Sequence, residues 1–199
     1  MNRIARLWRI ATHPRELRLA LSGLGARLAG DDALGGLTDE ETAALVRWTA
    51  DAGVSSFVEI GTLFGLTARA VAHGTPARVV AVDNFCWNPF GLTREQHEAF
   101  ARRAVSDAGV ELVRADAADF LGSLSDRVDP VGTLVFLDGS HAYVDVRREI
   151  ELCMAQKVRV LAGHDFGNAR FGVTRAVREL LGEPDEVCGM CWMKRLSDG

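Results

Sequence analysis

Along most of this chain, apolar and polar residues form two kinds of pattern: short apolar runs typical of buried strands, and a helical periodicity typical of amphipathic helices. Strand-like apolar runs cover residues 55–61, 77–83, 110–116, 132–139 and 158–165. Helical patterns cover residues 66–73, 93–109, 143–157 and 173–182, with a short one in "AADFLGSLSD". Five strands that alternate with helices predict an α/β fold, a doubly wound, mostly parallel and Rossmann-like sheet. Runs such as "VVAV" and "LVFL" suit strands that are covered on both faces.

The two ends of the chain depart from this alternation. Thr38-Asp-Glu-Glu41 has the capping-box pattern and predicts a helix over residues 39–52. We expect residues 1–52 to form an N-terminal helical cap within the same domain, and residues 53–199 to form the ligand-binding domain. The last ten or so residues have a strand pattern, which predicts a short hairpin turning at Gly189.

Length and charge narrow the class of protein. The 199 residues suit one domain, and a net charge of −4 argues against a general nucleic-acid binder. The charge is uneven, because residues 1–30 hold six arginines and one glutamate. We expect this basic segment to form helices that pack on the domain or on a second copy of the chain, as in a homodimer; attachment to a membrane surface is the alternative. No apolar run reaches the roughly 18 residues of a membrane span, so stable membrane insertion is not expected.

The four cysteines indicate a reducing compartment, because no secretory signal accompanies them, and we expect a cytoplasmic protein. "CGMC" at residues 188–191 has the spacing of a redox or half-zinc motif. It lacks a second such pair and lies in a strand pattern, which favours a structural role.

Ligands of a doubly wound sheet bind outside the carboxyl ends of its strands. Nearly every predicted strand ends in an acid, and polar or glycine residues accompany these acids: Glu59 with Gly61, Asp83 with Asn84, Asp116, Asp138, and Asp165 with His164. One such acid could simply cap a helix, but five in register indicate a ligand site.

The first of these strand ends indicates which ligand. Gly61-Thr-Leu-Phe-Gly65 lacks the middle glycine of a dinucleotide fingerprint, which disfavours an NAD-linked oxidoreductase. Glu59, just before the turn, would repel a phosphate and suits a ligand with an ammonium group. Asp83 follows Gly61 by 22 residues, where an acceptor for ribose hydroxyls is expected. An adenosine with a cationic amino-acid tail is S-adenosylmethionine.

These segments resemble the motifs of class I S-adenosylmethionine-dependent methyltransferases: "VEIGTLFG" the first, "VVAVD" the second and "VRADAADF" the third. The resemblance covers roughly residues 40–199. It implies that Gly61 and Gly65 admit the methionine part, that Asp83 holds the ribose, and that Asp116 with Ala117 borders the adenine. Further residues expected to bind the cofactor are Glu59, Thr62, Asn84 and Asp138.

Two later segments bear on the chemistry. "VFLDGSHAYVDVRREIEL" and "LAGHDF" resemble a branch of small-molecule O-methyltransferases with macrocin-type and cephalosporin-hydroxylase-like members. Members often hold a divalent metal between acids that match Asp138 and Asp165. His164 stands where many relatives have another acid; as a third ligand it would suit Mn²⁺ or Fe²⁺ better than Mg²⁺. His141, three residues after Asp138, would be the general base.

The function predicted from the sequence is therefore O-methylation of a small hydroxylated metabolite, with S-adenosylmethionine as cofactor and assistance from Mg²⁺, Mn²⁺ or Fe²⁺. A metal-independent methyltransferase is one alternative, and a non-catalytic S-adenosylmethionine-binding or assembly subunit is another. The loop over residues 83–97, with Phe85, Trp87 and Phe90, is expected either to line the ligand site or to form a small apolar cluster. Tyr143 is expected to pack, not to catalyse.

Overall fold

The computed structural model describes residues 36–87 and 92–196. The predicted basic helices within residues 1–30, and Phe90 of the loop, lie outside these ranges. The elements in chain order are α3 (Asp39–Asp51), β1 (Ser56–Ile60), α4 (Leu66–Gly74), β2 (Arg78–Asp83), α5 (Arg94–Ala104), β3 (Glu111–Arg114), α6 (Ala117–Gly122), the 3₁₀ turn η2 (Leu124–Asp126), β4 (Thr133–Leu137), α7 (Tyr143–Ala155), β5 (Val160–Gly163), α8 (Val173–Leu181), β6 (Glu186–Cys188) and β7 (Cys191–Arg195).

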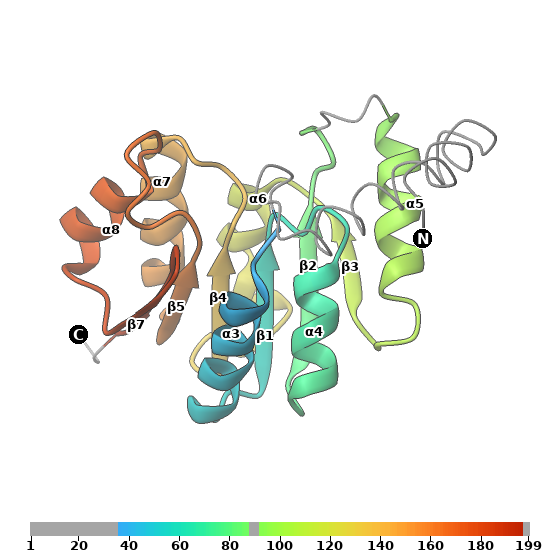
Figure 1. Cartoon of the computed structure of the whole chain (residues 1–199), viewed down its shortest axis with the longest axis horizontal. Helices are drawn as coiled ribbons and strands as arrows, with labels where there is room; N and C mark the ends of the chain where they lie inside the picture. The colour runs from blue at the N-terminus through green and yellow to red at the C-terminus, as the bar shows by residue number, and fades with distance from the viewer. Residues whose placement is uncertain (1–35, 88–91, 197–199) are drawn as a thin grey trace, which may run out of the picture.

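The strands form one sheet in the order β3-β2-β1-β4-β5-β7-β6 (Figure 1). The pairs among β1 to β5 are parallel, whereas β7 runs antiparallel to both β5 and β6. The predicted doubly wound, mostly parallel sheet is therefore confirmed. The order reverses between β1 and β4, and such a switch point is where ligands bind in this architecture.

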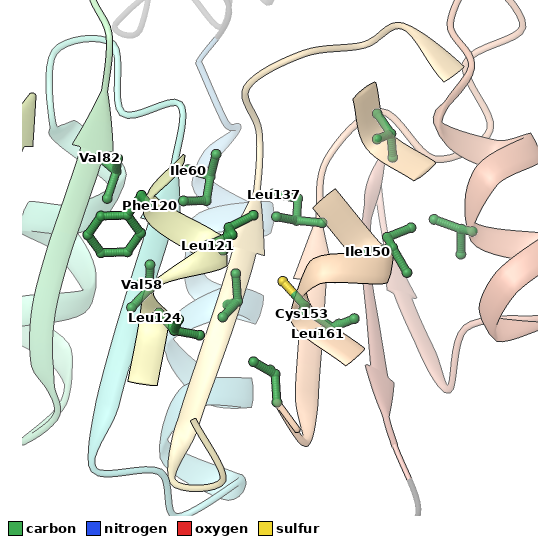
Figure 2. Close-up of a cluster of buried hydrophobic side chains, with 14 of the residues drawn as sticks. Val58, Ile60, Val82, Phe120, Leu121, Leu124, Leu137, Ile150, Cys153 and Leu161 are labelled. Atoms are coloured by element: carbon green, nitrogen blue, oxygen red, sulfur yellow. The ribbon is translucent and has the colours of Figure 1, made fainter. Parts of the chain in front are cut away.

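Helices cover both faces of the sheet, which explains why β1 and β4 are buried along their whole length. On one face the apolar sides of α3, α4 and α5 pack on the sheet, and Figure 1 shows α3 and α4 in front of it. On the other face α6, α7 and α8 pack on the alternate strand residues. Figure 2 shows Phe120 and Leu121 of α6 and Ile150 of α7 over Ile60 and Leu137.

Most predicted boundaries hold to within a few residues. The capping box at Thr38 and Glu41 is present at the start of α3. Helix α5 ends at Ala104, five residues before the predicted end, and the chain leaves it through a turn in which Gly109 has φ +68°. The predicted C-terminal hairpin forms, with Gly189 at φ +59° in its turn. Within the described ranges, no helix is both long and apolar enough to cross a bilayer.

Candidate functional site

A cavity of about 1220 Å³ lies at the carboxyl ends of the parallel strands. Because these ends meet at one edge of the sheet, residues far apart in the sequence share its wall. Most of the site residues expected from the sequence line this cavity: Gly61, Asp83, Asn84, Asp116, Ala117, Asp138, His141, His164 and Asp165. Glu59, Thr62 and Gly65 are not in its lining.

Gly61 brings the turn after β1 against the turn after β4. Its φ is +86°, and a Cβ at this position would lie 2.2 Å from the carbonyl oxygen of Asp138 and 2.5 Å from the Cα of Gly139. Only glycine allows this approach. Gly65, with φ +76° at the start of α4, is needed for another reason, since its Cβ would lie 2.5 Å from a methyl group of Val105.

Asp83 at the end of β2 is held by two backbone groups. Its Oδ2 accepts a hydrogen bond from the Leu63 N–H at 2.8 Å, and its Oδ1 accepts one from the Phe85 N–H at 2.6 Å. A carboxylate has about four lone-pair sites, so this side chain keeps capacity for two ligand hydroxyls. Beside it, the Asn84 amide donates to Asp116 Oδ1 at 2.8 Å and so links the ends of β2 and β3.

Glu59 lies inside β1 and is buried behind the cavity wall. The Thr62 hydroxyl donates a hydrogen bond to its carboxyl group. Burial, with a smaller contribution from the Asp83 charge, raises the pKa of Glu59 to about 8. In this structure Glu59 and Thr62 shape the turn from behind, and their predicted contact with a ligand stays a prediction.

Two acids and two histidines gather at the other side of the cavity, after β4 and β5. His141 Nδ1 lies 3.0 Å from Asp165 Oδ2, and His164 Nδ1 lies 3.7 Å from oxygens of both Asp138 and Asp165. One ligand atom from each of Asp138, His141 and Asp165 lies within 4.8 Å of the others, close enough to surround one metal ion. The Phe171 ring stacks on His141 with centroids 4.5 Å apart and holds the plane of the imidazole.

Glu41 of α3 completes this cluster, although its sequence pattern predicted only a capping role. One of its carboxylate oxygens lies 3.3 Å from His164 Nε2 and accepts a hydrogen bond from the Met190 N–H at 2.8 Å. The other accepts from the N–H and the hydroxyl of Thr38. The same side chain therefore caps a helix and pairs with a histidine 123 residues away.

The cluster is strongly coupled electrostatically. Burial disfavours a charge on His164, but the carboxylates of Asp165, Glu41 and Asp138 outweigh it and raise the pKa of His164 to about 10. Burial likewise opposes ionisation of Asp165, yet His141 and His164 hold its pKa below the usual range. At Asp138 burial dominates, and nearby carboxylates add to it, so the pKa of Asp138 lies well above its usual value despite His164.

The wall between α6 and α7 contains charged residues that the sequence analysis did not single out. Asp119 of α6 and Asp145, Arg148 and Glu149 of α7 all line the cavity. Asp145 accepts a hydrogen bond from the Ser140 hydroxyl at 2.7 Å. Helical spacing alone would have shown that residues 145 and 149 share a face, but not that this face borders a cavity.

The aromatic residues of the region divide between packing and the cavity. Phe85 is fully buried and its ring lies edge-on to His97, whereas Trp87 lines the cavity and is 59% exposed. The predicted loop thus has both roles. Tyr143 packs between helices, as expected: its hydroxyl donates to Glu179, and the Arg175 guanidinium lies 4.2 Å from its ring centroid.

The CGMC segment forms the β6–β7 hairpin, in which Cys188 and Cys191 are register partners and both thiols are free. Cys191 lies close enough to Glu41 and His164 to share a metal ion with them. However, the Glu41 oxygens already accept hydrogen bonds from Thr38 and Met190, and burial raises the pKa of the Cys191 thiol. We therefore regard these residues as part of the folded framework.

Comparison with known protein families gives one match: residues 58–166 match the family described as "Methyltransferase domain". This segment runs from β1 to the loop after β5 and contains every residue that lines the cavity except Asn168, Arg170, Phe171 and Met190. No curated protein sequence matches the chain.

Several solved structures share the fold. The O-methyltransferase from Bacillus cereus in complex with SAH is 18% identical, with a TM-score of 0.58 over 78% of this chain and 73% of that one. CalS11, a TDP-rhamnose 3'-O-methyltransferase of calicheamicin biosynthesis, is 18% identical, with a TM-score of 0.57 over 98% and 92% of the two chains. The SAH-bound Podospora anserina methyltransferase PaMTH1 is 15% identical, with a TM-score of 0.63 over 93% and 89%. At these identities the likeness concerns the fold alone.

Proposed function

The chain belongs to the methyltransferase domain family, and from that premise we propose that it transfers the methyl group of S-adenosylmethionine to a hydroxyl group of a small metabolite. The observation that carries this proposal is one cavity with two chemically different sides. A carboxylate poised for ribose hydroxyls, Asp83, lies on one side, and a histidine paired with a carboxylate, His141 with Asp165, lies on the other.

S-adenosylmethionine as methyl donor is supported by the placement of Asp83 and by the relatives. Asp83 is fixed by two N–H groups and still has free acceptor capacity, as a ribose-binding carboxylate requires. Two structures of similar fold, from Bacillus cereus and Podospora anserina, are described as bound to SAH. An adenosyl ligand fits a cavity of this volume.

In this proposal His141 acts as the general base. Its Nδ1 hydrogen bond to Asp165 leaves Nε2 free to accept the proton of the acceptor hydroxyl. The oxygen then forms a bond to the methyl carbon while the carbon–sulfur bond breaks, and the sulfonium leaves as a neutral thioether. The ionised Asp165 stabilises the imidazolium that results, and the stacked Phe171 keeps the ring in place. Because the displacement is in-line, positioning supplies much of the rate.

A divalent cation fits the residues present. Asp138 and Asp165 offer two carboxylate oxygens, and a nitrogen of His141 lies within 4.8 Å of them. The third ligand expected from the sequence, His164, has its Nδ1 3.7 Å from both acids. A His141 that bound the cation would be a ligand and not the base, so His141 acts as base only where the two acids and His164 hold the cation. This mixed donor set suits Mn²⁺ or Fe²⁺ at least as well as Mg²⁺. A cation held there would polarise the acceptor oxygen as a Lewis acid. Burial raises the pKa of Asp138 well above its usual value. A cation bound beside Asp138 would lower this pKa and so favour the ionised carboxylate.

A metal-independent methyltransferase is the second candidate, and two observations favour it. The protonated ring of His164 already places a positive charge beside Asp138, Asp165 and Glu41. In addition, the Nδ1 of His141 that bonds to Asp165 is not available to a metal at the same time. In this alternative the His141–Asp165 pair alone activates the acceptor.

The methyl acceptor is proposed as a class only. CalS11, of similar fold over nearly the whole chain, is described as acting on TDP-rhamnose, so nucleotide sugars are a rational first group of acceptors to test. Arg170 and Asn168, which line the cavity on the same loop as Phe171, could contact polar groups of such an acceptor.

The test begins with binding and continues with transfer. Calorimetry should show saturable binding of S-adenosylmethionine and S-adenosylhomocysteine but not of NAD; the reverse would refute the proposal. Methyl transfer from labelled donor to a panel of hydroxylated metabolites should then be measured with and without chelator. Loss of activity in chelator, restored by Mn²⁺ or Fe²⁺, supports the metal-assisted reaction, whereas full activity in chelator supports the second candidate.

A further inference from the structure

One acid in the cavity wall has no partner. Glu149, in the second turn of α7, is only 4% exposed, and its Oε2 makes no hydrogen bond within the described residues. Among the residues that line the cavity and are described, it alone has a buried side-chain polar atom without a partner. Buried polar groups are nearly always hydrogen-bonded in folded proteins, so such a group requires an explanation.

The surroundings of Glu149 do not supply that partner. Asp145, one turn earlier on α7, is a second acid and is occupied with Ser140. Asp119 faces the same cavity from α6 and is also an acid, while Arg148 lines the wall without an ion pair to Glu149. Burial, and to a lesser extent the Asp145 charge, raises the pKa of Glu149 to about 8. At neutral pH this carboxyl group is mostly protonated and can both accept and donate a hydrogen bond.

The position of Glu149 indicates which part of a ligand it would meet. If Asp83 holds the ribose and the methyl group points to His141, the adenine of the ligand must extend along a different wall of the cavity. The stretch Asp116–Asp119 and the start of α7 form such a wall, and both line the cavity. Figure 2 shows Ile150 of α7, the residue after Glu149, beside Leu137 at the end of β4.

We propose that the Glu149 carboxyl group recognises the 6-amino edge of the adenine of S-adenosylmethionine. This rests on the proposed function. The 6-amino group is the only N–H donor of an N9-substituted adenine, and N1 beside it is an acceptor. A protonated carboxyl group can accept from the amine and donate to N1, which satisfies both of its oxygens. Glu149 is thereby a positioning residue, which fixes the base so that the methyl group faces the acceptor.

A ligand that lacks the amine tests this directly. S-adenosylhomocysteine and its 6-deamino (purine) analogue should be titrated calorimetrically into the wild-type protein, into Glu149→Gln and into Glu149→Leu. We expect the wild type to prefer the parent by roughly tenfold or more, the size of one buried hydrogen bond. Glu149→Gln, which keeps an acceptor and a donor, should retain the preference, and Glu149→Leu should lose it. Glu151→Gln on the exposed side of α7 is the matched control, with wild-type behaviour expected.

The possible outcomes distinguish a failure of the proposed methyltransferase function from a failure of the proposed role of Glu149. If the wild type binds neither ligand, the proposed function fails and the role of Glu149 fails with it. If it binds both equally, or if Glu149→Leu keeps the full preference, only the role of Glu149 is refuted and the methyltransferase assignment stands. Should Glu149→Leu not fold, as judged by circular dichroism, the wild-type comparison of the two ligands and Glu149→Gln still decide.

Discussion

Replacing Glu41 with glutamine should show how much the buried charge pair with His164 stabilises the protein. The surroundings of Glu41 lower its pKa from 4.5 to about 2: burial opposes ionisation, but His164, Thr38 and Met190 together outweigh burial. This lowering corresponds to about 3 kcal/mol of unfolding free energy at neutral pH. Glutamine has one acceptor oxygen, so it can keep the bonds from Thr38 or the bond from Met190 but not both. We therefore expect Glu41→Gln to cost about 1–3 kcal/mol, made up of a lost backbone hydrogen bond, which does not depend on pH, and the charge interaction with His164, which does.

The pH dependence of the unfolding free energy shows whether the cost of Glu41→Gln comes from the charge pair with His164. A carboxyl group with a depressed pKa stabilises the fold fully above pH 4.5, and this stabilisation is lost as the pH falls toward 2. The raised pKa of His164 acts oppositely: its contribution is complete below pH 6.5 and is lost as the pH rises through about 10. The difference between wild type and Glu41→Gln should therefore be largest between pH 4.5 and 6.5 and should shrink on both sides.

Urea unfolding at a series of pH values from 3.5 to 10 measures this difference. Glu40→Gln is the matched control, because Glu40 is the exposed neighbour on the same helix. It should change the unfolding free energy by less than about 0.5 kcal/mol at every pH. An equal cost for Glu41→Gln at all pH values, or a cost no larger than that of the control, would refute the reasoning.

Three further predictions concern the cavity. An alanine in the left-handed conformation costs about 1–2 kcal/mol of unfolding free energy, and Gly61→Ala should cost more than this because its Cβ would collide with Asp138. The control is Gly53→Ala, where φ is +62° and the space is open, so thermal unfolding should show the conformational cost alone. Asp83→Ala should weaken S-adenosylhomocysteine binding by about 1.5–3 kcal/mol in calorimetry, and unchanged affinity would contradict its ribose role. His141→Ala should slow methyl transfer by roughly 10²–10⁴-fold with cofactor affinity retained, whereas exposed His73→Ala should not slow it.

The strands of the sheet could be predicted from the sequence because a local run of apolar residues marks each parallel strand. Short apolar runs such as residues 134–137 of β4, bounded by glycines in the neighbouring turns, favour strands covered on both faces. The cavity acids at strand ends followed from the same logic, since parallel strands end at one edge. Asp83 and Asp138 could therefore be named before the structure was known.

The residues that sequence reasoning missed depend on contacts between distant segments. Glu41 fits a capping box completely, and nothing local reveals that His164, 123 residues later, lies against its carboxylate. Glu149 falls at a helix position that could equally face solvent, and its burial depends on how α7 meets α6. The C-terminal end of α5 was misplaced for a related reason, because helix ends fray where tertiary contacts stop.

The close approach of Gly61 to the backbone of Asp138 and Gly139 has a mechanical consequence. With no room between them, the turn after β1 and the turn after β4 cannot slide past each other, so these two rims of the cavity move as one rigid block. Any opening that admits a ligand or releases a product must come from the opposite rims. Of these, the loop of Asn168 and Phe171 is held in the same way, since a Cβ at Gly172 would lie 2.3 Å from the Tyr143 N and the Gly172 N–H donates to the His141 carbonyl, which leaves the rim formed by Asn84, Cys86 and Trp87.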